Sequence, residues 1–151
     1  MTNPTIKYDT SKFDAALQAI SFGVNDLKTI ESKGALVLKE GMQQRAAKDT
    51  GDMSDGIQSH IIEESNEKIE DDVGPEASYA PYQEYGTGIY AEAGNGRKTP
   101  WVYRDRNGNF HTTRGNRPHP FVRPTALQDH DKVIDAMDKE FKRKLLTAWL
   151  R

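Results

Sequence analysis

The sequence predicts an α+β fold with a long N-terminal helix, a small, mostly antiparallel β-sheet with a protruding hairpin, and a C-terminal helix. Apolar residues recur at helical spacing near both ends of the chain, and they alternate with polar residues in two short central runs. Further on, an Asn-Gly pair separates two β-prone runs, which is a strong hairpin signal. Because 151 residues suit one domain, we expect residues 1–151 to form a single domain with a long insert or arm at residues 89–117.

The N-terminal helix is expected within residues 11–48, with Ser11 suited to the N-cap position. Its register changes near Gly23 and Gly34, so the pattern predicts one long helix or two helices joined near Gly34. The helical run is expected to end by residues 49–51, where Gly51 can terminate it. The first apolar stripe contains Phe13, Leu17, Ile20, Val24 and Leu27, and the second contains Leu38, Met42 and Ala46.

The apolar period changes to two over residues 56–74, which predicts an antiparallel hairpin with one poorly hydrophobic face. Ser65-Asn66 has turn chemistry, and Pro75 ends the second strand. Residues 78–88 follow and are rich in Tyr and Gly, and Tyr82 and Tyr85 are expected to share one face of a short helix.

The tyrosines of this region have two interpretations. Their rings suit stacking on nucleic-acid bases, and they equally suit packing in the core with hydroxyls at an interface. We favour packing because the neighbouring charged residues, Glu84 and Glu92, are acidic. The tyrosines concerned are Tyr79, Tyr82, Tyr85 and Tyr90.

The arm contains the Asn-Gly signal. Residues 101–105 and 109–113 flank Arg106-Asn107-Gly108, which predicts a β-hairpin inside the arm. A long insert in a small domain is usually functional or mobile.

The C-terminal part is expected to run from an extended segment into a final helix. Residues 118–124 contain three prolines, and a residue before proline avoids the helical conformation. Phe121 is the expected anchor of this segment. The helix should start near Pro124 or Thr125 and end near Trp149. Its apolar stripe is Leu127, Ile134, Met137, Phe141 and Leu145.

Charge is unevenly distributed along the chain, although the net charge is only −2. Residues 49–76 contain ten acidic residues and one basic residue, whereas residues 97–123 contain seven basic residues and one acidic residue. Such blocks either form two solvated faces or bind each other when copies associate head to tail.

The composition excludes several classes of protein. No apolar run is long enough for a membrane span, and we expect no secretory signal at the first residues. The absence of cysteine excludes disulfide scaffolds, thiolate metal sites and thiol nucleophiles, and it fits a reducing cytoplasm. A hydrophobic fraction of 35% predicts a small core with much of the chain in loops, arms or surfaces that are buried on assembly.

Three stretches, in this order, resemble one protein family. They are residues 46–53 (AAKDTGDM), residues 79–88 (YAPYQEYGTG) and residues 117–127 (RPHPFVRPTAL). Together they resemble the neck or tail-completion proteins of long-tailed bacteriophages, the "gene product ten" family of lambdoid phages. Lys48 stands where the family often has proline, and Met53 where it often has leucine; Met53 still fills an apolar position.

This resemblance implies a structural virion protein of the head–tail junction, in a phage or a prophage. It implies a homo-oligomeric ring around the channel through which DNA leaves. The implied partners are the head-closure or connector protein and the tail-terminator or tail-tube protein. The implied location is the virion, with assembly in the cytoplasm of the bacterial host. The family has no established catalytic residues, so none are assigned here.

The arm carries the residues that we expect to make contacts in such an assembly. If the arm faces the channel, its cations would contact DNA phosphates without reading sequence. If it faces a neighbouring subunit, these cations would pair with the acidic block at 49–76. We favour contact with a neighbouring subunit, because DNA that must slide through a channel gains little from tight binding.

An alternative function is a nucleic-acid-binding module that uses residues 97–123. The candidate interface residues are Arg97, Lys98, Trp101, Tyr103, Arg104, Arg106, Phe110, Arg114 and Arg117.

Two loops resemble known binding motifs without completing them. Asp49, Asp52 and Asp55 are spaced by three, whereas a calcium loop of the EF-hand type needs ligands at alternate positions. Residues 86–88 (GTG) lack the Gly-Lys-Ser/Thr element of a phosphate-binding loop. We therefore expect no metal site and no cofactor.

A small hydrolase is the remaining rival. His111 and His119 together with Asp105 would be its site, and its activity would be sensitive to loss of either histidine. Metal-dependent nuclease sites usually contain several acidic residues close together, whereas Asp105 is the one acidic residue in 97–123. The sequence therefore predicts that the protein is not an enzyme.

Overall fold

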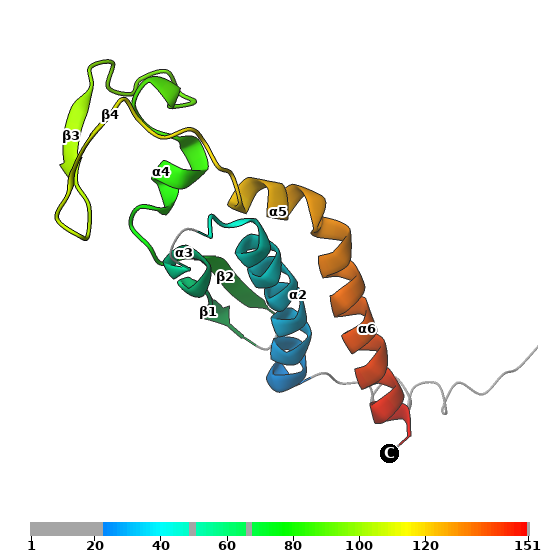
Figure 1. Cartoon of the computed structure of the whole chain (residues 1–151). Coiled ribbons are helices and arrows are strands. Elements are labelled where there is room, and N and C mark those ends of the chain that lie inside the picture. The colour runs from blue at the N-terminus through cyan, green and yellow to red at the C-terminus, as the bar shows by residue number, and fades with distance from the viewer. Residues whose placement is uncertain (1–22, 49–50, 66–67, 151) are drawn as a thin grey trace, which may run out of the picture.

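Two helices and a two-stranded sheet form the body of the molecule, and a second hairpin stands off it (Figure 1). The computed structural model describes residues 23–48, 51–65 and 68–150, so the expected N-cap Ser11 and the start of the first stripe lie outside the described residues. The described helices are α2 (Val24–Arg45), α3 (Asp52–Asp55), α4 (Ala80–Tyr85), η1 (Gly88–Tyr90), α5 (Val122–Gln128) and α6 (His130–Trp149). The strands are β1 (Ile57–Glu64), β2 (Ile69–Pro75), β3 (Trp101–Arg104) and β4 (Phe110–Thr113).

The predicted α+β class is confirmed, with two separate two-stranded antiparallel sheets between the long helices. Helix α2 is central: the β1–β2 sheet packs on one side of it, and α6 runs antiparallel to it on the other side (Figure 1). Because α2 is covered on both sides, its buried residues do not form one stripe. Among the described helices, none combines the length and the apolar composition needed to cross a membrane.

Glycines allow α2 to lie close to the C-terminal helices. A Cβ at Gly34 would lie 2.9 Å from the Met137 sulfur, and a Cβ at Gly41 would lie 2.5 Å from Asp129 Oδ2. The described part of α2 continues through both glycines, so the helix is not divided near Gly34. It begins at Val24, with Gly23 extended at its N-cap, and residues 11–22 of the predicted helical run lie outside the described residues. The helix ends at Arg45, because Ala46 adopts an extended conformation and packs in the core.

The core is small and lies where α2, the start of β1, α4 and the start of α5 meet. Phe121 and Ile57 are both 0% exposed, which confirms Phe121 as the anchor of the extended segment before α5. The core residues are Met42, Ala46, Met53, Ile57, Ala80 and Phe121, with Val73, Ala77 and Val122 packed against them.

The predicted hairpin at 56–74 is confirmed as β1–β2, and Pro75 is the last residue of β2. Ile57 pairs with Pro75 and Ser59 with Val73, so these residues share the face that packs on α2. The register shifts at a bulge between Ile61 and Glu63.

The C-terminal segment differs from the prediction, because it forms two helices instead of one. Helix α5 begins at Val122, just before Pro124, and the chain leaves the helix at Asp129 before α6 begins. The predicted apolar stripe is also wrong in part, since Leu127 is 82% exposed and Ile134 is 53% exposed.

Buried polar residues take the place of that stripe against α2. Asp129 is 2% exposed and accepts hydrogen bonds from Arg45 at 2.5 Å and from Lys132 at 2.6 Å. Thr125 and Glu140 are also buried. The break between α5 and α6 thus places the Asp129 carboxylate against α2, where Arg45 and Lys132 compensate the cost of its burial, while Leu127 is left exposed.

Candidate assembly interface on the arm

The arm is attached to the body where two backbone segments cross, residues 87–89 and 114–116, which we call the arm root. Thr87 N–H donates to the Asn116 carbonyl at 2.9 Å, and Ile89 N–H donates to the Arg114 carbonyl at 3.0 Å. The crossing requires glycine, because a Cβ at Gly88 would overlap the Arg114 carbonyl oxygen and a Cβ at Gly115 would overlap that of Thr87. Gly88 and Gly115 also have positive φ angles of 60° and 126°.

Glu84, at the end of α4, joins the region before the arm to the region after it. Its Oε2 accepts hydrogen bonds from the backbone N–H of Phe121 at 2.7 Å and of Val122 at 3.0 Å. Its Oε1 accepts a third from Arg123 N–H at 3.1 Å. The carboxylate therefore satisfies N–H groups at the start of α5, where a helix has no partners of its own.

The Arg123 side chain completes this cluster. Its guanidinium donates to Glu84 at 2.9 Å and to Glu92 at 2.9 Å, and it lies over the Tyr85 ring. Burial pushes the pKa of the Glu84 carboxyl up, but the three backbone N–H groups and Arg123 outweigh burial and hold that pKa below its usual range. Glu84 is therefore charged, although it is only 4% exposed.

The hairpin predicted within the arm is confirmed as β3–β4. Trp101 pairs with Thr113 and Tyr103 with His111, so these residues share one face, on which the Tyr103 and His111 rings stack with centroids 5.4 Å apart. The opposite face, which we call the arm outward face, consists of Val102, Arg104, Phe110 and Thr112.

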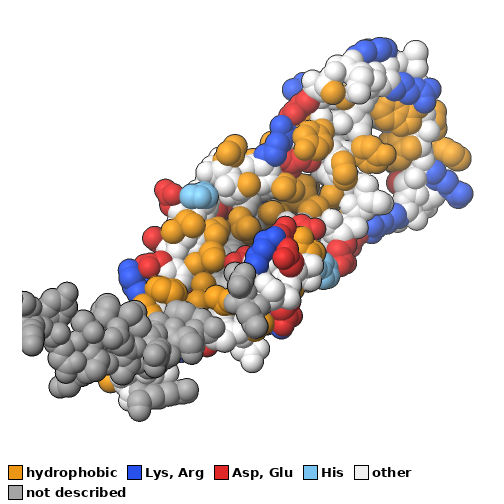
Figure 2. Space-filling model, turned by 180° about the vertical axis from the view of Figure 1, so that it is seen from behind, with side chains coloured by type: hydrophobic (Ala, Val, Ile, Leu, Met, Phe, Trp, Pro, Cys, Tyr) orange, Lys and Arg blue, Asp and Glu red, His pale blue; other side chains and the backbone are white. Residues whose placement is uncertain are grey.

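The arm outward face is the most exposed part of the hairpin. Phe110 is 75% exposed and Val102 is 61% exposed. The Arg104 guanidinium lies over the Phe110 ring at 5.8 Å, so a cation and an aromatic ring are presented together. Figure 2 shows hydrophobic side chains gathered on the arm, with Lys and Arg around them.

Asp105 organises the turn of this hairpin. Its Oδ1 accepts a hydrogen bond from the Asn109 N–H at 2.8 Å, and its Oδ2 lies 2.8 Å from His111 Nε2. These two contacts lower the pKa of the Asp105 carboxyl to about 2, and the contact with the His111 ring has the larger effect.

We expect the Asp105 carboxyl to titrate near pH 2, about two units below an ordinary aspartate. Because the pKa is depressed in the folded turn, the stabilisation is complete above the usual aspartate pKa and is lost as pH falls toward 2. The carboxyl ¹³C shift, measured by NMR during acid titration, checks this. His111→Ala should move the titration back toward pH 4, and Thr112→Ala, on the opposite face, should leave it unchanged; equal titration in both variants would contradict the assignment.

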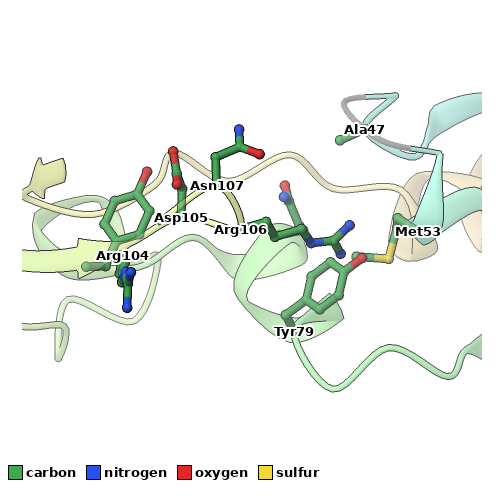
Figure 3. A pocket seen from close by; sticks show the side chains of 9 residues that line it. Ala47, Met53, Tyr79, Arg104, Asp105, Arg106 and Asn107 are labelled. Carbon is green, nitrogen blue, oxygen red and sulfur yellow. The ribbon is translucent and has the colours of Figure 1, made fainter. Parts of the chain in front are cut away.

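The turn of the hairpin reaches back to the body through Arg106. Arg106 and Asp52 form an ion pair at 2.5 Å, and Arg106 also lines an open cleft of about 600 Å³ between the arm and the body. Figure 3 shows Arg106 extending toward Tyr79 and Met53, and Tyr103 also lines the cleft. Among the described residues, the basic segment therefore forms one ion pair with the acidic segment, at the start of α3.

The other cations of the arm remain available. Within the described residues, none of them lies in an ion pair with a carboxylate. Arg97 and Arg117 lie over the rings of Trp101 and Tyr90, and Lys98 donates to a backbone carbonyl. All nine candidate interface residues lie on the arm but not on one face, because Trp101 and Tyr103 lie opposite Arg104 and Phe110. Among the described residues, Arg106 is the arm cation that forms an ion pair with the body. The arm cations without a carboxylate partner are Arg97, Lys98, Arg104, Arg114 and Arg117.

Comparison with known families identifies the chain. Residues 11–86, half of its length, match the family model described as "Bacteriophage HK97-gp10, putative tail-component". The protein belongs to the HK97 gp10-like family. Its members are bacteriophage structural proteins of the tail, which agrees with the resemblance noted in the sequence and with a location in the virion. No curated protein and no solved structure matches the chain.

The match to the HK97 gp10-like family ends at Gly86, just before the arm root. It contains α2, the β1–β2 sheet and α4, whereas the arm, α5 and α6 follow it. Glu84 lies inside the matched region and accepts a hydrogen bond from Phe121, which lies outside it. The stretch at residues 117–127 that resembles the family is therefore packed against the stretch at residues 79–88. The arm therefore lies between two parts of one packed unit.

The tyrosines of this HK97 gp10-like chain do not pack in the core, so that part of the prediction is wrong. All four are exposed, with Tyr82 at 62% and Tyr85 at 49%. The core beneath α4 is filled by Ala80 and by the buried Glu84 carboxylate, which leaves the rings on the surface.

The residues considered for a hydrolase site do not come together. His111 contacts Asp105, whereas His119 Nε2 lies 3.0 Å from the Arg45 carbonyl oxygen at the end of α2. In the described part of the chain, no group of three metal-ligating side chains is present. Family membership is consistent with a structural protein and not an enzyme.

Sequence reasoning missed Glu84, Arg123 and Asp129 as organising residues. Glu84 had one signal, an acidic residue within an otherwise aromatic and glycine-rich string. Arg123 lies two residues after the anchor Phe121 in the segment with three prolines, residues 118–124. Asp129 lies on the expected helix, where a charged residue would normally be solvated.

Proposed function

We propose that this chain is a structural subunit of the head–tail junction of a long-tailed phage or prophage, as a neck or tail-completion protein. In this role, copies form part of a ring around the DNA exit channel and bind a head-closure or connector protein on one side and a tail-terminator or tail-tube protein on the other. The proposal rests on the family and on one observation: an arm with exposed aromatic residues and unpaired cations projects from a small core. A subunit that binds neighbours through distinct surfaces needs such a projection.

The experiment is deletion of the gene in the source phage or prophage, followed by electron microscopy of the lysate. We expect filled heads and finished tails that lie separate, and joined particles after complementation with the wild-type gene. Joined particles in the deletion strain would contradict the proposed role.

Complementation with an arm-shortened variant tests the arm itself. Trp101 and Thr113 are paired, so residues 102–112 are replaced by Asn-Gly, a two-residue turn that spans a strand pair. The arm root and Glu84 remain intact, and we expect normal thermal unfolding but at least a tenfold loss of joined particles. Normal assembly by the shortened protein would show that the arm is dispensable.

A second candidate function is binding of nucleic acid by residues 97–123, and it is favoured by the cations without carboxylate partners. It predicts that the isolated protein binds duplex DNA, with an affinity that falls steeply as salt concentration rises. Fluorescence anisotropy with labelled DNA measures this. Tight binding that is lost in the arm-shortened variant would favour this candidate, whereas weak binding in both proteins favours contact with protein neighbours.

A further inference from the structure

The outer face of the β1–β2 sheet is the second exposed surface whose composition needs an explanation. Helix α2 packs on the inner face. The opposite face contains the partly buried pair Gln58 and Gly74. Its fully exposed part, which we call the sheet outer face, consists of His60, Glu63, Glu70 and Asp72. Ile62, the unpaired residue of the bulge, precedes Glu63 directly in the strand and is 61% exposed.

The charge of this face is largely uncompensated. Lys68 bridges Glu63 and Glu70, at 2.6 and 2.5 Å, and neutralises one of the two carboxylates. Asp72 has no cation within ion-pair distance among the described residues. A partner that brings cations together with an apolar group would pair with these carboxylates and bury Ile62.

The arm outward face has the complementary composition. Val102 and Phe110 are exposed, and the Arg104 guanidinium covers part of the Phe110 ring. Both surfaces are formed by two antiparallel strands, so both are narrow ribbons, and each combines exposed apolar side chains with charged ones, acidic on the sheet and basic on the arm. The Arg106–Asp52 ion pair demonstrates, within one chain, that the arm binds a carboxylate of the acidic segment.

We propose that the arm outward face of one copy docks on the sheet outer face of the next copy. In this arrangement Phe110 packs against Ile62, and Arg104 pairs with Asp72. The partner is a second copy because the chain's own body leaves both faces exposed while Arg106 holds the arm on Asp52. Two different surfaces meet in this contact, so it is head-to-tail and can close into a ring. The inference deepens the proposed function by naming the contact between ring subunits.

The absence of cysteine makes a cross-linking test direct. The full-length variant with Phe110→Cys and Ile62→Cys is treated with a short bis-maleimide, both as concentrated purified protein and in purified particles. We expect a ladder of covalent multimers, and unlinked monomers or at most dimers from each single-cysteine variant. The matched control joins Phe110→Cys with Leu127→Cys, because Leu127 is 82% exposed on α5 and lies outside the proposed contact. No ladder in either setting, or an equal ladder from the control pair, would overturn the proposal.

Charge exchange tests the polar half of the contact in the same double-cysteine protein. Arg104→Glu and Asp72→Arg should each lower the yield of multimers about tenfold, and together they should restore it to within about twofold of the parent. Asp131→Arg, at a fully exposed position on α6, is the control and should leave the yield unchanged. A combined variant as defective as the single ones would overturn the pairing of Arg104 with Asp72.

The outcomes for the contact and for the junction are separable. A ladder from purified protein together with joined particles in the gene-deletion strain would retain the subunit contact and reject the junction role. Separate heads and tails in the deletion strain, without a ladder from the cysteine pair, would retain the junction role and reject this contact.

Discussion

Replacement of Glu84 by glutamine is expected to lower the free energy of unfolding by about 3 kcal/mol, a large part of the total for a small domain. The glutamine side chain keeps the shape but has one acceptor oxygen where the carboxylate has two. It cannot accept from the N–H groups of Phe121, Val122 and Arg123 together, and buried donors are left without partners. Thermal or urea unfolding at neutral pH measures the change.

Glu92→Gln is the matched control, because Glu92 binds the same arginine from an exposed position. Loss of an exposed ion pair of this kind should cost less than about 1 kcal/mol. Similar losses for the two variants would show that Arg123, and not the N–H groups of α5, carries the effect.

The Glu84 effect should also depend on pH. The pKa of this carboxyl is depressed in the folded state, so its stabilisation is complete above the pKa of an unfolded glutamate, about 4.3, and is lost as pH falls through the folded-state value. The difference in stability between the wild type and Glu84→Gln should therefore shrink on acidification below about pH 4. A difference that stays constant down to pH 3 would contradict this linkage.

Gly88→Ala is expected to open the arm root, whereas Gly94→Ala is expected to be tolerated. The two glycines have similar positive φ angles, 60° and 68°, so alanine costs about 1 kcal/mol of backbone strain at either position. Only at Gly88 does the new Cβ overlap a backbone carbonyl, that of Arg114, while nothing lies within 4 Å of a Cβ at Gly94. The pair separates the effect of the crossing from that of the backbone conformation.

Amide hydrogen exchange at Ile89 and Asn116 reports directly on the arm root. We expect Gly88→Ala to speed exchange of these amides about 100-fold and to prevent head–tail joining, because the arm is no longer held in position. Gly94→Ala should change exchange less than about tenfold. Equal exchange rates in the two variants would contradict this prediction. They would mean that the arm root already opens in the wild type and that the crossing of residues 87–89 with 114–116 does not hold the arm in position.

The local features of the fold follow from short stretches of sequence. The arm hairpin and its turn follow from the Asn107-Gly108 pair. The structure shows why, because Gly108, at φ 90°, takes a conformation that few other residues adopt. The β1–β2 hairpin was predicted from its period of two, and Phe121 from its place in a proline-rich segment that cannot form a helix until it ends.

The features that could not be predicted from short stretches of sequence depend on residues far apart in the chain. The stripe expected on the last helix was assigned by hydrophobicity alone, but the face that packs on α2 carries Asp129, whose partner Arg45 is 84 residues away. The prediction places the tyrosines in the core, but Glu84 is the residue of α4 that is buried there. Its burial could not be predicted locally, because the N–H groups that donate to it lie 37 to 39 residues further along the chain. A buried charge is stable only with partners in place, and the linear sequence does not show which partners meet it.

The sequence by itself determined the α+β class, both hairpins, the separation of acidic and basic segments and the family. These depend on neighbouring residues, whose backbone preferences and spacing act over a few positions. The tertiary structure alone decided which helix face is buried, which face of the arm points outward and where the arm meets the body. These depend on the close backbone crossing at Gly88 and on the close approach of the Asp129 and Thr125 side chains to Gly41. They also depend on ion pairs at Glu84 and Asp129, because burying a charge requires a partner brought by the fold.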